Sequence, residues 1–93
     1  MTSRDIILLK ATMMAESDGI RGIITTSLSA MCEIPHSSFY YHFGSIDGLR
    51  EEVVRKAIDD ENLKVIGKAL SEGHPLVQSL DRELKTRALD SLI

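Results

Sequence analysis

Apolar side chains recur at helical spacing near the start of the chain. Two series of this kind are Ile6, Leu9 and Met13, and Ile7, Ala11 and Met14. Positions three or four apart lie on one face of a helix, so the pattern predicts a helix over residues 3–18. Thr2 and Asp5 have the spacing of a capping box, with aspartate in place of the usual glutamate. Gly19 is expected to end the helix, because glycine adopts the left-handed conformation at little cost.

Two short helices are expected next, separated by a tight turn. The N-cap candidates for the first of them are Thr25, Thr26 and Ser27. Its inward side chains would be Leu28, Met31 and Cys32. Pro35 disfavours helix in the residue before it and suits a helical first turn, so the first helix is expected to end near Cys32. The next helix would run from about Pro35 to His42.

The second half of the chain predicts a long fourth helix and a C-terminal helix. Ser45 or Asp47 would cap the fourth helix, which would continue to Gly73. Both helices carry pairs of an acidic residue four positions before a basic one: Glu51–Arg55, Glu52–Lys56, Asp60–Lys64, Asp81–Lys85 and Glu83–Arg87. The last helix would begin near Pro75. Its apolar stripe would consist of Leu76, Leu80, Leu84 and Ala88.

No segment has both the composition and the partner that a strand requires. Residues 20–26 are rich in β-branched side chains, but there is no second candidate strand to pair with them. The expected fold is therefore all-α with about five helices. A three-helix unit would occupy residues 1–46, and a helical extension with a region for dimerisation would occupy residues 47–93.

Composition narrows the class of protein. Hydrophobic residues make up 43% and charged residues 27% of the 93 residues, which is an ordinary globular mixture. The longest strongly apolar run, Ile6 to Leu9, is far shorter than a membrane span, and the N-terminus lacks the features of a secretory signal. The single cysteine, Cys32, excludes an internal disulfide. Together these features predict a cytoplasmic protein without membrane association.

The two short helices over residues 26–42 have the pattern of a helix-turn-helix unit. Such a unit needs a small residue in its first helix, here Ser29, so that the second helix can cross closely. Its apolar lock would consist of Leu28, Cys32, Ile34 and Phe39. The outward face of the second helix would carry Pro35, His36, Ser37, Ser38, Tyr41 and His42. A helix of this size fits the DNA major groove, where serine contacts base edges and histidine and tyrosine hold phosphates.

The run from Ile34 to Ser45, IPHSSFYYHFGS, followed by Leu49, resembles the DNA-binding region of TetR-family transcriptional repressors. The resemblance covers about residues 3–58, and its most specific part is the block from Phe39 to Phe43. The resemblance implies that Ser37 and Ser38 read bases and that Tyr40 and His42 contact the DNA backbone. Phe43 and Leu49 fall on core positions of the family. Family members continue into a longer domain that binds a ligand and dimerises. A chain of this length has no room for such a cavity, so we expect either a protein without a small-molecule effector or a fragment of a longer one. No cofactor is expected.

Five positions depart from the family pattern. Glu33 stands where the family has the turn glycine, and Ile46 stands where it has the lysine after the serine. Leu28-Ser29 replaces an isoleucine–alanine pair. Ile24 aligns with the capping threonine, so Thr25 or Thr26 would take over the capping role. No Lys or Arg lies between Gly22 and Leu49. Because affinity for DNA depends on neutralised phosphates, this predicts weak binding with a shallow salt dependence. The missing charge would come in part from the flanking Arg4, Arg21 and Arg50.

The sequence gives less support to metal binding or catalysis. Cys32, His36 and His42 lack the spacing of a zinc site, so we interpret them as a buried thiol and two surface histidines. The histidines and Ser37 lack an orienting acid and an oxyanion motif, so the chain is not expected to be an enzyme. The C-terminal leucine stripe would either fold back on the chain or pair with a second copy. We favour the dimer, because palindromic half-sites need two copies.

The sequence therefore predicts a homodimeric transcription regulator that binds a palindromic operator in double-stranded DNA, with repression as the default. The third helix would enter the major groove, with base contacts from His36, Ser37 and Ser38. Phosphate contacts would come from Thr25, Thr26, Tyr40, Tyr41 and His42. The alternative is a helix-turn-helix recruited to bind a transcription or regulatory protein, with little DNA binding. The net charge of −3 is compatible with that alternative.

Overall fold

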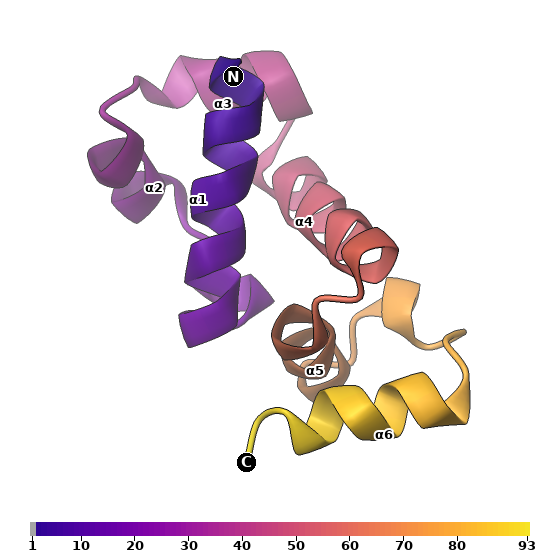
Figure 1. The fold of residues 1–93 in the computed structure, drawn as a ribbon. Helices are drawn as coiled ribbons and strands as arrows, with labels where there is room; N and C mark the ends of the chain where they lie inside the picture. The colour runs from indigo at the N-terminus through magenta and orange to yellow at the C-terminus, as the bar shows by residue number, and fades with distance from the viewer. Residues whose placement is uncertain (1) are drawn as a thin grey trace.

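A computed structural model describes residues 2–93, and within that range every regular element is helical (Figure 1). The helices are α1 (Ser3–Asp18), α2 (Thr25–Cys32), α3 (His36–Phe43), α4 (Ile46–Asp60), α5 (Leu63–Ser71) and α6 (Arg82–Asp90). Two short 3-10 helices, η1 (Ile20–Gly22) and η2 (Pro75–Val77), lie in the connections. The all-α fold class is confirmed, with six α-helices rather than about five. None of the helices described has the length and apolarity needed to cross a membrane.

One hydrophobic core extends through the helices. Figure 1 shows α1 beside α2, α4 leading away from α3, and α6 crossing next to α5 at the far end from α3. Helix α1 packs against α2, α4 and α5, so it joins the N-terminal helices to the C-terminal ones. Fully buried side chains from these elements include Ile7, Leu28, Phe39, Leu49, Val53 and Ile66. The helix-turn-helix region therefore rests on the same core as the C-terminal helices.

The first helix has the bounds and the caps that the sequence predicts. The Thr2 hydroxyl accepts a hydrogen bond from the Asp5 amide, and the Asp5 carboxylate accepts one from the Thr2 amide, both at 3.2 Å. These hydrogen bonds hold the pKa of Asp5 below its usual value. Gly19 ends the helix with φ of +85°. The capping box and the C-terminal glycine are thus confirmed.

The prediction of one long fourth helix up to Gly73 is wrong. Helix α4 ends at Asp60, Glu61 is left-handed with φ of +51°, and Asn62 caps a new helix by accepting the Val65 amide at 3.3 Å. The side chain of Asn62 thus offers the backbone a competing hydrogen bond that starts α5 in another direction.

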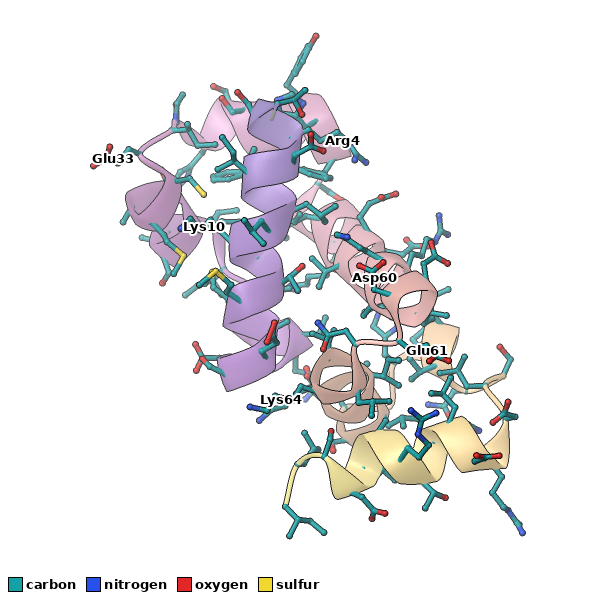
Figure 2. All side chains as sticks on the ribbon, viewed as in Figure 1. Arg4, Lys10, Glu33, Asp60, Glu61 and Lys64 are labelled. Atoms are coloured by element: carbon teal, nitrogen blue, oxygen red, sulfur yellow. The ribbon has the colours of Figure 1, made fainter. Side chains whose placement is uncertain are left out.

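The break in the fourth helix also changes the expected ion pairs. The Glu51–Arg55 pair forms at 2.6 Å as predicted. Lys56, however, pairs with Asp60 at 2.7 Å and not with Glu52, and this contact raises the pKa of Lys56. Asp60 and Lys64 lie on opposite sides of the break, so their predicted pairing along one helix is lost (Figure 2).

The C-terminal helix begins later than predicted. Pro75 opens the short η2 helix, and α6 starts only after Asp81, whose carboxylate accepts the Leu84 amide at 2.8 Å. Asp81 is therefore a helix cap and not the ion-pair partner of Lys85, whose ammonium donates to the Gln78 carbonyl at 2.6 Å. The leucine stripe packs within the chain: Ala88 is buried, and the members that pack partly buried against the core are Leu76, Leu80 and Leu84.

Candidate nucleic-acid interface

Helices α2 and α3 are joined by a tight turn of the kind that the sequence predicts. Glu33 occupies the left-handed region, with φ of +57° and ψ of +41°, where glycine is the usual residue. The Ser29 hydroxyl donates a hydrogen bond to the Ile34 carbonyl across the turn. Ser29 is therefore small enough for the close crossing and also ties the turn to α2. Figure 2 shows the Glu33 side chain projecting away from the other helices.

The predicted apolar lock holds the two helices together. Leu28 and Phe39 are fully buried, and Cys32 and Ile34 are partly buried against the same core. Burial raises the pKa of the Cys32 thiol, so the thiol stays protonated at neutral pH. The lock fixes α3 with its Phe39 side inward, which determines the side chains that α3 presents to solvent.

The outward face of α3 is centred on Ser37 and Tyr41. These two residues are one helical turn apart and opposite Phe39, and both are exposed, Tyr41 to 85%. Tyr40 is 52% exposed on one flank of this face. His42, on the other flank, is partly buried and lies edge-on to Tyr41, with ring centroids 5.0 Å apart.

All eight predicted site residues thus retain contact with solvent. In α3 the base-contact candidates are in the first turn, where His36 and Ser37 are exposed and Ser38 is partly buried. In α2, Thr26 is exposed and Thr25 partly buried. No side chain caps either helix, so the amide groups of both first turns are free of side-chain partners within the described residues.

The predicted capping of α2 by Thr25, Thr26 or Ser27 is wrong. The helix begins at Thr25, and the N-cap position falls on Ile24, in extended conformation with φ of −123° and ψ of +143°. The isoleucine side chain has no acceptor, so it leaves the first amides of α2 without a side-chain cap. Thr25 and Thr26 are consequently first-turn residues.

The three flanking arginines are engaged within the protein. Arg4 lies 3.2 Å from Glu52 and its guanidinium stacks 4.9 Å from the centre of the Phe43 ring. Arg50 donates two hydrogen bonds to a backbone carbonyl and pairs with Asp47 at 3.3 Å. The remaining one, Arg21, lies 3.6 Å from the carboxylate of Glu72. Arg4 and Arg50 are thus held by contacts within the protein, whereas the Arg21 side chain, in η1, remains 81% exposed.

Comparison of the chain with known proteins identified no relative. No protein-family model, no curated protein and no solved structure matches the chain.

Proposed function

We propose that this protein is a TetR-like transcription regulator that binds a palindromic operator as a homodimer, with repression by occlusion as the default. The observation that carries the proposal is the outward face of α3, centred on Ser37 and Tyr41. It is polar, exposed and supported from beneath by the buried Phe39. A helix presented in this way has the dimensions that the major groove admits.

The roles within the interface follow from reach and chemistry. The first-turn residues His36, Ser37 and Ser38 contact base edges, because the N-terminal part of a recognition helix lies deepest in the groove. The aromatic and threonine side chains that hold phosphates are Thr25, Thr26, Tyr40, Tyr41 and His42. The uncapped first turns of α2 and α3 add amide groups oriented toward the phosphates.

Removal of one hydroxyl from this face is expected to separate the two kinds of contact. Ser37→Ala should weaken operator binding about tenfold while leaving binding to random DNA unchanged, because a base contact carries the sequence information. Tyr41→Phe should weaken binding to both DNAs alike, because a phosphate contact carries none. The measurement is fluorescence anisotropy with a duplex selected from a random library. Ser71→Ala, at an exposed position in the last turn of α5, is the control for Ser37→Ala.

Operator binding equal to that of the parent by both α3 variants would contradict the assignment of this face.

Operator affinity should also decline only gently as the salt concentration rises. Each neutralised phosphate contributes a slope of about −0.9 in a plot of log affinity against log salt, and this interface has few cations to supply such contacts.

Replacement of Glu33 by glycine is expected to improve both stability and DNA binding. The left-handed conformation favours glycine by about 1 kcal/mol, so unfolding should become harder by that amount. The loss of a carboxylate at the turn should also reduce repulsion of phosphates. Glu61→Gly is the matched control, because Glu61 has φ of +51° and the same charge but lies at the far end of α4. Urea denaturation and DNA titration should show equal stabilisation of both variants and tighter DNA binding only for Glu33→Gly; tighter binding by both would contradict a local effect.

The second candidate function is a protein-interaction module, favoured by apolar side chains on the surface of α1 and α2. Those at least 38% exposed on these helices or next to them are Ile6, Leu9, Met13, Ile24 and Met31. Met13, Ile24 and Met31 line one shallow cleft, and an apolar surface of this kind is typical of protein contacts. Retention on heparin at low salt separates the two functions, because a DNA-binding protein is retained and an interaction module of this acidity is not.

A further inference from the structure

The connection between α1 and α2 is held by a carboxylate from the end of α5. Glu72 accepts hydrogen bonds from the Ile20 amide at 2.6 Å and from the Arg21 amide at 2.8 Å. The same carboxylate lies 3.6 Å from the Arg21 guanidinium. These contacts join residues 51 and 52 positions apart in the chain, so they tie the C-terminal helices to the segment that leads into α2.

The backbone of this connection is shaped to admit the carboxylate. Gly19 has φ of +85°, and a Cβ atom at this position would lie only 2.6 Å from Glu72 Oε2. Glycine therefore provides both the backbone conformation and the space for the close approach. The Glu72 side chain is 18% exposed in the contact, so water has limited access to it.

A second side chain holds the same connection from α4. The Arg50 guanidinium donates to the Ile23 carbonyl from Nε at 3.1 Å and from Nη2 at 2.8 Å. Ile23 is fully buried, and the first hydrogen bond of α2, from the Leu28 amide to the Ile24 carbonyl, follows directly after it. The start of α2 is thus fixed by one contact to α4 and by the Glu72 contacts to α5.

An open cleft of about 500 Å³ lies beside these contacts and is accessible to solvent. It is lined by residues of η1, α4 and the segment after α5, including Arg21, Arg50, Glu51, Glu72 and His74. Ile20 and Ile23 bury the connection in the core, and the polar contacts of Glu72 and Arg50 hold it on the side that faces the cleft.

We propose that Glu72 is a positioning residue for DNA binding, through which α5 and α6 set the orientation of α2 and α3. By holding the Ile20 and Arg21 amides, Glu72 fixes the point from which α2 starts, and the buried Leu28–Phe39 contact region carries that position to α3. The DNA-binding part of this inference rests on the proposed function. The structural part, that Glu72 orders the start of α2, does not.

The test compares Glu72→Ala with Glu51→Ala in the full chain. Glu51 lines the same cleft and loses the same charge, but its partner is Arg55 within α4. Glu72→Ala should accelerate hydrogen exchange at the Leu28 amide and weaken operator binding about tenfold relative to Glu51→Ala, a coupling of ordinary size. Glu72→Gln, which keeps a carbonyl acceptor for the amides, should recover part of both effects and covers the case in which Glu72→Ala does not fold.

Each outcome decides a different part of the inference. Faster exchange at Leu28 with operator affinity equal to that of Glu51→Ala would overturn the link to DNA binding. Unchanged exchange at Leu28 in Glu72→Ala would overturn the positioning role itself. If the parent protein binds no DNA, the proposed function fails, and the exchange rate at Leu28 alone still decides whether Glu72 orders the start of α2.

Discussion

Phe39→Ala is expected to destabilise the protein by about 3–5 kcal/mol, the range for truncation of a fully buried phenylalanine. Phe39 is the largest of the fully buried side chains and the only buried residue of α3. Its removal leaves a cavity beneath the helix that carries the proposed recognition face. A domain of this size has about 5–15 kcal/mol of stability in total, so the loss is a large share of it and should lower the midpoint of unfolding markedly.

The matched control for Phe39→Ala is Tyr41→Ala, which truncates an aromatic residue of the same helix. Tyr41 is 85% exposed, so its loss should change stability by no more than about 0.5 kcal/mol. Urea denaturation followed by circular dichroism gives both values. Similar destabilisation by the two variants would mean that α3 does not turn its Phe39 side to the core.

Gly67→Ala is expected to destabilise the protein by about 1–3 kcal/mol, the usual effect of overpacking. Gly67 is buried where α5 crosses α6, and a Cβ atom there would collide with the Ala88 carbonyl oxygen. The same atom would also lie 3.1 Å from the Leu92 side chain. Because the obstacle is backbone of another helix, it can be relieved only by moving α6 away from α5.

The sign of the Gly67→Ala effect makes the test decisive. At an exposed helical position the change from glycine to alanine stabilises by about 1 kcal/mol. Alanine also has a higher helix propensity than serine, so Ser71→Ala, at the exposed end of the same helix, should be neutral or stabilising. Thermal denaturation of both variants provides the comparison, and a Gly67→Ala protein more stable than the parent would contradict the close α5–α6 packing.

Local signals account for the parts of the fold that the sequence predicts well. The bounds of α1 follow from the Thr2–Asp5 capping box and from Gly19, all within one turn of the helix ends. The apolar pattern does not reveal the break after α4, because apolar residues continue in helical register through it, at Ile58 and beyond. Asn62 was the available signal, since asparagine is a strong N-cap residue.

The candidate site was predictable where it depends on helical spacing. The inward Leu28 and Phe39 and the outward Ser37 and Tyr41 follow from the register of two short helices. The contacts of Arg50 and Glu72 with the connection between α1 and α2 were not predictable. They join residues 27 to 52 positions apart, and only the tertiary packing brings those residues together.

The central claim is that the outward face of α3 binds duplex DNA, and amide chemical shifts test it most directly. Titration of the 15N-labelled parent protein with its selected duplex should shift the first-turn amides of α2 and α3 (residues 25–27 and 36–38), while α6 remains unchanged. A scrambled duplex at the same salt should give smaller shifts at residues 36–38. Shifts confined to the exposed apolar side of α1, or none at α3, would contradict the account.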